Sequence, residues 1–438
     1  MIELIASLEV GRLVFVLLVL LVYFGISFLT KKWFFSSIAF LLFLLPFNIT
    51  FQLTNLPFIS EEYIQGIVSN YTIPTLHFLD VFVFIVLIII LKKKLITNLF
   101  QTEKIFFLCL FFLFTIKAVV DWEMLSVITV YRLFFYAFTI YISAKYFLLQ
   151  YSFSIREKQI LTFILLITII IQFGIGLGQF LQGSSLGLSF LGESQIVKGM
   201  YGTSFVELQN QVFLRAYGTF PHPNVLAGYL FFLLPVCFSF LKGYLRYISL
   251  TLVVILIFLT FSRIAIFLSL GFFLVLFLKY FWNKIGGFIP LFFDRFLNFD
   301  HGLSDRIELV KNGFEIIKNY PLWGIGASQY VYGIDYYPVY TAGGFLLLEP
   351  VHNIYILLLA EYGLVLGIPL VLCILYFLFR NFLKGELFLK YTVFGILIIS
   401  MLDHYFITLP QGILLFLMVI SFGYIYTLRI RSGCGKVA

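Results

Sequence analysis

The sequence predicts an all-α integral membrane protein, a polytopic helical bundle of about twelve transmembrane helices. Of the 438 residues, 62% are hydrophobic and only 11% are charged, which is too little charge to cover the surface of a water-soluble chain of this length. Apolar runs of about 17–25 residues recur between short polar breaks, and a run of about 20 such residues crosses a bilayer as a helix. The 57 Phe and 27 Tyr residues add surfaces suited to lipid and to the membrane interface.

The apolar runs divide the chain into an N-terminal set of transmembrane helices, residues 1–182, and a C-terminal region, residues 183–438. The second region includes two long segments predicted to be external, 183–218 and 282–351. The predicted spans are 13–30, 33–47, 75–91, 104–120, 124–148, 157–181, 223–241, 245–261, 264–281, 353–378, 388–409 and 412–428. Since the first run meets Lys31 and Lys32 and not a small-residue cleavage motif, we expect it to be a retained helix.

Charge placement predicts the sidedness of these spans. Most Lys and Arg residues fall in short loops, among them Lys92–Lys94 and Lys242 with Arg246, as cytoplasmic loops require. The net charge of +8 therefore indicates topology and not nucleic-acid binding. Loop 48–74 has no Lys or Arg and is predicted to be external. The polar edge before residue 353 is also external if segment 285–299 crosses or re-enters the membrane.

The four cysteines, Cys109, Cys237, Cys373 and Cys434, show no paired spacing and no neighbouring histidine. Three of them fall inside apolar spans. They predict neither a disulfide framework nor a metal site.

The stretch EPVHNIYILLLAEYGLVLGIP, residues 349–369, is the strongest candidate for chemistry. His352 lies where a membrane helix begins, and a neutral imidazole there can accept a proton from a bound hydroxyl, since its ordinary pKa is about 6.5. The alternative is an interfacial histidine that only caps the helix. Glu361 cannot be its partner, because nine residues of helix place the two on opposite faces, about 13 Å apart along the axis. We assign Glu361, Gly363 and Gly367 to packing.

Two arginines precede this stretch on the side predicted to be external. Arg215 lies in RAYGTFPHPNVLAGYL, where Asn224 can cap the following helix. Arg263 interrupts two apolar runs at a turn in LTFSRIAIF. Both could be ordinary solvated or snorkelling side chains. Two planar cations on one membrane face would nevertheless suit a diphosphate.

Further polar residues fall inside or beside apolar runs, where such groups usually face the bundle interior. Asn353 adjoins His352, and Asp403 with His404 begins DHYFITLPQG. Arg132 interrupts VITVYRLFFYAF, and His77 shares a helix face with Asp80. Mutual hydrogen bonding or salt bridging is the alternative for all of these residues, and we favour it for His77 and Asp80. No Walker loop, dinucleotide fingerprint, HExxH or nucleophile elbow is present.

The segment 301–350 is the largest polar region. Within it, DRIELVKNGFEIIKNYP predicts one amphipathic helix with Ile307, Val310, Phe314 and Ile317 on its apolar face, ended by Pro321. Such a helix could lie flat on the membrane or cover a cavity.

Several of these motifs, in this order, resemble the O-antigen ligase/polymerase superfamily of bacterial membrane glycosyltransferases. The resemblance spans roughly residues 200–430 and is carried by RAYGTFPHPNVLAGYL, the TFSR turn, NYPLWGIG after the amphipathic helix, HNIYILLLAEYGLVLG and DHYFITLPQG. The N-terminal third matches only as generic helices.

This resemblance implies transfer of a glycan from an undecaprenyl-diphosphate-linked donor at the outer, periplasmic face of the cytoplasmic membrane. By the family pattern, Arg215 and Arg263 would bind the donor diphosphate, and His352 would activate or position the acceptor hydroxyl. Asn224, Asn353, Arg132, Asp403 and His404 would support them. No cofactor and no essential metal are expected, because arginines replace the cation that would stabilise the leaving group.

The sequence leaves several functions open. The acceptor could be lipid A–core, as for a ligase, or another lipid-linked repeat unit, as for a polymerase. A related protein O-oligosaccharyltransferase, a transporter or flippase of lipid-linked oligosaccharides, and a scaffold of an envelope assembly complex are the alternatives.

Overall fold

The computed structural model of the chain describes residues 11–431 apart from 12, 14, 18, 26, 29–30, 54–70, 197–202, 209–210, 282–301, 341–343 and 345. These residues are mostly helical, which confirms the predicted all-α class. Among the described residues, five helices are long and apolar enough to cross a membrane: Met124–Leu149, Ile155–Gln182, Pro223–Phe240, Ile354–Lys384 and Pro410–Arg429. Shorter apolar helices are Phe15–Gly25, Trp33–Leu44, Gly243–Leu259, Arg263–Leu276 and Leu387–Leu402. The protein is therefore a membrane protein by its helices, whereas the predicted number of about twelve crossings stays a prediction.

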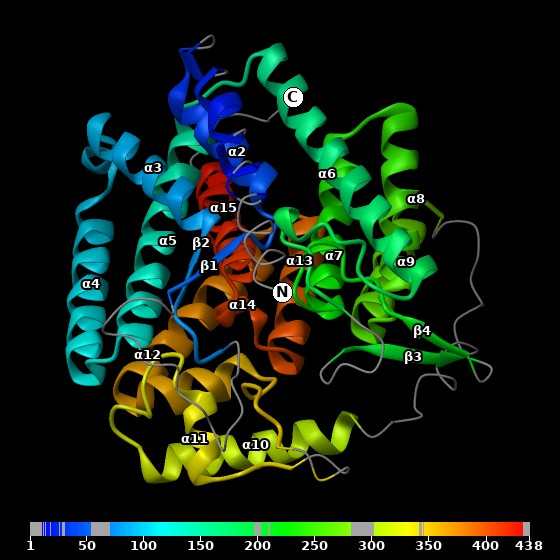
Figure 1. The fold of residues 1–438 in the computed structure, drawn as a ribbon. Helices are drawn as coiled ribbons and strands as arrows, with labels where there is room; N and C mark the ends of the chain where they lie inside the picture. Colours follow the sequence, from blue (N-terminus) through cyan, green and yellow to red (C-terminus); the bar gives the residue numbers. More distant parts are fainter. Residues whose placement is uncertain are drawn as a thin grey trace.

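Figure 1 shows the helices as a bundle with short elements at one end. On one side lie α3 (Phe78–Lys92), α4 (Gln101–Asp121) and α5 (Met124–Leu149). On the other side lie α6 (Ile155–Gln182), α8 (Gly243–Leu259) and α9 (Arg263–Phe281). The helices that complete the bundle are α2 (Trp33–Leu44), α7 (Pro223–Phe240), α12 (Ile354–Lys384), α13 (Leu387–Leu402) and α15 (Pro410–Arg431).

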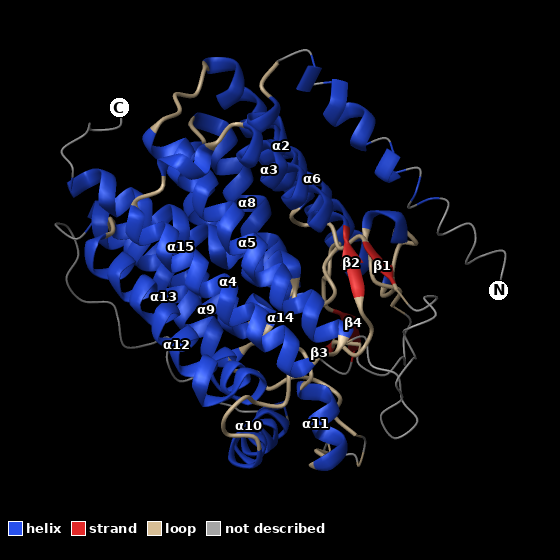
Figure 2. Cartoon of the chain, turned by 90° about the vertical axis from the view of Figure 1, so that its left-hand side faces the viewer, coloured by secondary structure: helices blue, strands red, loops and turns tan. Residues whose placement is uncertain are grey.

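The short elements surround one end of this bundle. The helices α10 (Gly302–Asn319) and α11 (Tyr330–Tyr336) lie across it, and the four-residue α14 (Tyr405–Thr408) joins α13 to α15. Two antiparallel strand pairs, both visible in Figure 2, join β1 (Thr50–Gln52) with β2 (Thr75–His77), and β3 (Phe205–Leu208) with β4 (Gln211–Leu214). The remaining turns of helix are the 3₁₀ segments η2 (Ser189–Leu191) and, at the opposite end of the bundle between α3 and α4, η1 (Leu95–Asn98).

Ion pairs identify the opposite end, which we call the basic end. There Lys145 of α5 lies 2.5 Å from Glu103 at the start of α4, and Lys32 lies 2.9 Å from Glu157 at the start of α6. The end that carries α10, α11 and α14 is the loop end. Because Lys and Arg collect on the cytoplasmic side, the basic end is the one expected to face the cytoplasm.

The helix α9 begins at the loop end and packs further on against the parts of α7 and α13 that lie near the basic end, through Phe272. The next helix, α10, is at the loop end again, where Arg306 donates a hydrogen bond to the carbonyl of Leu402. The predicted crossing over 285–299 falls between these helices and lies outside the described residues.

The long helix α12 is broken at Gly363, whose φ of 65° and ψ of −177° are not helical. The loop 321–328, which holds PLWGIGAS, fits into the break. The Leu364 amide donates to the Pro321 carbonyl at 2.7 Å, and the Ile325 amide donates to the Ala360 carbonyl at 2.9 Å. The glycine we expected to admit a neighbouring helix thus admits a loop, which fixes the half of α12 that begins at the loop end.

We expect Gly363→Ala to destabilise the protein. A non-glycine residue at positive φ costs about 1–2 kcal/mol, and a Cβ here would also lie 2.2 Å from the Leu322 carbonyl oxygen. Thermal unfolding in detergent should start several degrees lower than in the wild type. Gly174→Ala in α6 is the matched control, because its Cβ would meet nothing within 4 Å. Equal melting temperatures for the two variants would contradict this reading of the break.

The structure corrects the apolar face predicted for the amphipathic helix. In α10 the fully buried apolar residues are Leu309 and Ile316, whereas Ile307 is 47% and Phe314 57% exposed. The Asn312 side chain donates to the Tyr337 carbonyl at 2.6 Å, so a polar residue also occupies the buried face. Val310 and Ile317 are partly buried against the same cluster, so the predicted face was right for these two residues and wrong for Ile307 and Phe314.

The predicted span 388–409 was too long. Helix α13 ends at Leu402, and Asp403 has an extended backbone with φ −156° and ψ 161°. Asp403 and His404 therefore lie between helices at the loop end, and not inside a continuous span.

Candidate functional site

The loop end brings the start of α12 next to the end of α13. The Asn353 side chain caps α12 by accepting hydrogen bonds from the amides of Tyr355 at 3.0 Å and Ile356 at 3.1 Å. Its amide nitrogen also donates to the Met401 carbonyl at 3.3 Å. One residue therefore sets the direction of α12 and ties it to the segment that carries Asp403.

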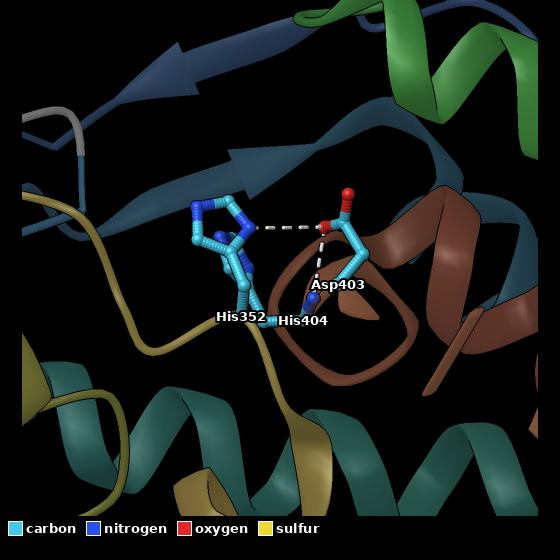
Figure 3. Close-up of side chains that lie close together, drawn as sticks. All are labelled: His352, Asp403 and His404. Atoms are coloured by element: carbon cyan, nitrogen blue, oxygen red, sulfur yellow. Dashed lines mark hydrogen bonds and ion pairs between the residues drawn. The ribbon is translucent and has the colours of Figure 1, made fainter. Parts of the chain in front are cut away.

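His352 lies between two carboxylates, as Figure 3 shows for one of them. Its Nε2 is 3.3 Å from Glu349 Oε2, and its Nδ1 is 3.9 Å from Asp403 Oδ1, an ion-pair distance too long for a hydrogen bond. The Nδ1 atom is buried without a hydrogen-bond partner. The His404 ring stacks obliquely 5.0 Å from the His352 ring, and the His404 amide donates to Asp403 at 2.8 Å. We call Glu349, His352, Asp403 and His404 the histidine cluster.

Electrostatics decide the protonation of this cluster. Burial opposes the charge on His352, but the contacts with Asp403 and Glu349 outweigh it and raise the pKa of His352 to about 9. Burial would raise the pKa of Asp403, yet the proximity and charge of His352 hold it well below its usual range. Burial and the charge of His352 lower the pKa of His404 to about 4. At neutral pH the cluster therefore holds two carboxylates and one imidazolium, and its net charge is negative.

The raised pKa of His352 makes stability depend on pH in a definite direction. A protonated His352 stabilises the folded state fully below its unfolded pKa of 6.5, and this contribution disappears as pH rises through about 9. The effect is on the order of 3 kcal/mol. We expect the melting temperature of the wild type to fall between pH 6.5 and 9 more steeply than that of His352→Gln. If the melting temperatures of the wild type and His352→Gln change with pH in the same way, the cluster does not hold this proton.

Arg215 reaches the loop end from the segment that follows β4. Its Nε donates to the Thr260 carbonyl at 2.6 Å, and its Nη2 donates to the Asn224 side chain at 2.8 Å. Among the described residues these are the only hydrogen bonds of its side chain, so the other N–H groups of the planar fork are available to a ligand. Two protein contacts fix the orientation of the guanidinium before any ligand arrives.

Three arginines converge here. Burial and the charges of Arg306 and Arg263 lower the pKa of Arg215 to about 10, so it remains charged at neutral pH. Arg263 begins α9 and is exposed, whereas Arg306 in α10 is half-buried. The charge of Arg306 also acts on His352. An anionic ligand bound among these three cations would offset their mutual electrostatic repulsion.

His222 links the arginines to the histidine cluster. Its Nδ1 accepts from the Asn224 amide at 3.1 Å, so His222 caps α7 and Asn224 does not, contrary to our expectation. Burial and the charge of Arg215 lower the pKa of His222 to about 4, and Asp403 and Glu349 also act on it. Its Nε2 lies 3.1 Å from Ser204 Oγ. Asn224 is instead free to orient Arg215.

Arg132 lies in a different network. Its Nη2 is 3.0 Å from Asp80 Oδ2 and 2.6 Å from the Thr75 carbonyl oxygen. Asp80 also accepts a hydrogen bond from the His77 backbone amide at 2.8 Å, which agrees with the mutual bonding that we favoured for His77 and Asp80. The structure therefore places Arg132 with the β2–α3 junction and shows no contact between it and the histidine cluster. Of the predicted site residues, the loop end gathers Arg215, Asn224, Arg263, His352, Asn353, Asp403 and His404.

A metal ion could be held by part of the histidine cluster. One ligand atom each from His352, Asp403 and His404 lies within 4.8 Å of the others. Two imidazoles and a carboxylate are ligands that zinc accepts. The prediction of metal-independent chemistry stays a prediction.

Sequence reasoning missed three members of the site: Glu349, His222 and Arg306. Glu349 and His222 lie within motifs already singled out, three residues before His352 and two before Asn224, so proximity in sequence could have found them. Arg306 gave no such signal, because it sits in a charged amphipathic helix where an arginine is ordinary.

The fold and this site define a polytopic membrane protein with cations and histidines gathered at one end of its helices. Residues 247–371 match the family model described as O-antigen ligase (Wzy_C). This match confirms the resemblance seen in the sequence over a narrower region, from within α8 to within α12, and it contains Arg263, Arg306 and His352. Over this region, which is less than a third of the chain, the protein is similar to O-antigen ligases. No curated protein matches the chain.

Proposed function

We propose that this protein is a membrane glycosyltransferase that transfers a glycan from an undecaprenyl-diphosphate-linked donor to an acceptor hydroxyl in surface polysaccharide synthesis. The observation that carries the proposal is that the loop end holds Arg215, bonded to Thr260 and Asn224, Arg263 at the start of α9, and Arg306, bonded to the Leu402 carbonyl next to Asp403 of the histidine cluster. The arginines offer planar, always-charged groups suited to a diphosphate. The cluster beside them offers a place for the proton of the acceptor.

The reaction exchanges one bond for another. The acceptor oxygen forms a bond to the anomeric carbon, the bond from that carbon to the diphosphate oxygen breaks, and polyprenyl diphosphate leaves with the bonding electrons. The arginines stabilise the negative charge that develops on the leaving group. No nucleotide is required, because the diphosphate of the lipid is itself the leaving group.

The proton of the acceptor hydroxyl goes to the histidine cluster. His352 already holds a proton at neutral pH, so it does not act alone as a neutral imidazole. Glu349 and Asp403 stay ionised beside it, so one of these carboxylates accepts the proton while the new bond forms and then releases it to water. The groups titrate together, and the base is therefore a property of the cluster. His352 positions the hydroxyl and shares the proton with its carboxylates.

The loop end would face the periplasm of a bacterial cytoplasmic membrane, because the basic end is the side expected in the cytoplasm. An acceptor on lipid A–core would make the protein a ligase, and a second lipid-linked repeat unit would make it a polymerase. Both acceptors present a sugar hydroxyl to the same site, so the geometry supports either.

Reconstitution with purified lipid-linked donor and candidate acceptors tests the proposal. We expect polyprenyl diphosphate to be released only when a glycan acceptor is present, and we expect the reaction to continue in the presence of a chelator. Movement of the intact lipid across the membrane without release would instead identify a flippase. Transfer to lipid A–core or to a second lipid-linked glycan distinguishes the ligase from the polymerase.

A further inference from the structure

Tyr71 brings part of the N-terminal half of the chain into contact with the histidine cluster. Its ring lies 5.7 Å from the His404 ring at an interplanar angle of 78°, which is an edge-to-face contact. The same imidazole lies 5.0 Å from the His352 ring and is only 4% exposed. Burial and the charges of Glu349 and Asp403 raise the pKa of the Tyr71 phenol, so both carboxylates lie within electrostatic range of it.

Backbone contacts with two separate elements hold the segment that carries Tyr71. The Tyr332 hydroxyl of α11 donates a hydrogen bond to the Thr72 carbonyl at 3.2 Å, and Thr72 is only 5% exposed. The Leu53 amide donates to the Pro74 carbonyl at 2.9 Å and so continues the pairing of β1 with β2, the blue strands in the upper part of Figure 3. The position of Tyr71 is therefore set by α11 and by this strand pair.

Arg132 anchors the strand pair to the helices. Its Nη2 donates to the Thr75 carbonyl at 2.6 Å, and its Nε and Nη2 each lie 3.0 Å from a carboxylate oxygen of Asp80. The Tyr136 hydroxyl donates to the same carboxylate at 2.5 Å. Arg132 and Tyr136 both belong to α5, so this helix fixes the start of β2 and the segment before it. Arg132 thus has an indirect connection to the histidine cluster, through the segment that carries Tyr71.

We propose that Tyr71 is a positioning residue of the histidine cluster and that Arg132 fixes its place, an inference that rests on the proposed function. Tyr71 holds the His404 ring beside His352, because an edge-to-face pair favours one relative orientation of its rings. This orientation matters for the reaction, since a displacement of about 1 Å can cost about 100-fold in rate. The N-terminal half therefore completes the site, although the match to the family model begins at residue 247.

Chemical modification of His404 tests this contact without catalysis. Diethyl pyrocarbonate modifies accessible imidazoles, and mass spectrometry of peptides gives the rate at His404. Tyr71→Ala should uncover the ring and speed its modification by about tenfold, the equivalent of one lost aromatic pair. Tyr71→Phe keeps the ring contact and should leave the rate unchanged.

Tyr151→Ala is the matched control for this modification. It removes another half-buried tyrosine, at the basic end, where the Tyr151 ring lies 5.1 Å from the Phe147 ring. The variant loses similar packing without touching the histidine cluster, so modification of His404 should stay slow. Slow modification in Tyr71→Ala, or equal acceleration in Tyr151→Ala, would overturn the proposal.

Kinetics test the effect of Tyr71 on the reaction. Tyr71→Ala should lower kcat by about tenfold or more, and it should leave the donor KM unchanged, because Arg215 is held by other contacts. Tyr71→Phe should retain most of the wild-type kcat. In the His352→Gln background Tyr71→Ala should cause little further loss, since it acts through the cluster.

Two kinetic results would overturn the positioning role: full kcat in Tyr71→Ala, or an equal loss in Tyr71→Phe. If the wild type transfers no glycan to any acceptor, the proposed function fails. Modification of His404 then still decides whether the Tyr71 ring covers it.

Arg132→Lys tests the anchor. Lysine keeps a positive charge opposite Asp80, but an ammonium cannot replace the planar fork that binds both Asp80 oxygens and the Thr75 carbonyl. This variant should lower kcat by about threefold or more, and it should add little to the loss in Tyr71→Ala. If Arg132→Lys folds poorly, Tyr332→Phe releases the same segment from α11 and should act in the same way. Full kcat in both variants, or losses that multiply with that of Tyr71→Ala, would overturn the role of the anchor.

Discussion

His352→Gln is expected to lower kcat for glycan transfer by about 10²–10⁴-fold. Glutamine can still hydrogen-bond the acceptor, but it carries no proton and leaves Glu349 and Asp403 facing each other without the imidazolium between them. Donor binding should change little, because Arg215 does not depend on this side chain. A discontinuous kinetic assay with saturating donor, together with a separate measurement of donor Kd, separates the two effects.

Asp403→Asn tests whether the cluster acts as a unit. If His352 and Asp403 share one proton, the kcat of the double variant His352→Gln/Asp403→Asn should be little lower than that of either single variant. Removing either residue already abolishes the joint contribution of the pair. If the two residues act independently, the fold-reductions in kcat of the two single variants should multiply in the double variant. A single Asp403→Asn variant with full kcat would contradict the participation of the carboxylate, provided that its melting temperature matches the wild type.

The fold could be predicted well wherever the information is local. Each apolar run matched a helix because burial in lipid demands long apolar segments, and the run itself records that demand. The end of α13 at Leu402 was not foreseen, because the apolar run continues past Asp403 and only tertiary contacts stop the helix there. The break in α12 was hidden for the same reason. Gly363 reads as a packing glycine until the loop 321–328 is placed against it.

The candidate site divides in a similar way. His352, Arg215 and Arg263 were singled out because a charged or titratable group at the edge of an apolar run is costly and therefore informative. The same rule selected Arg132, whose cost is offset locally by Asp80. Sequence position could not tell a group paired within the scaffold from one turned toward the site.

Arg215→Ala is expected to reduce kcat/KM for the donor by about 10²–10³-fold, the size of effect seen when one preorganised donor to a developing negative charge is removed. Arg215→Lys should recover only part of this loss, because an ammonium keeps the charge but cannot replace the planar fork. Lys311→Ala is the matched control. It removes a cation from the same end of the molecule, where the Lys311 side chain is 65% exposed and, within the described part of the chain, forms an ion pair with Glu308 alone.

The partner of Arg215 makes the prediction sharper. Asn224 accepts from Nη2 at 2.8 Å and so fixes the plane of the guanidinium, and it need not touch the donor itself. Asn224→Ala should therefore lower kcat/KM by a smaller factor and have little further effect when Arg215 is already lysine, since the fork it orients is then absent. If Asn224→Ala costs the same factor in both backgrounds, it contacts the donor independently. If Lys311→Ala costs as much as Arg215→Ala, the loss reflects general electrostatic attraction, and the diphosphate is not bound by this fork.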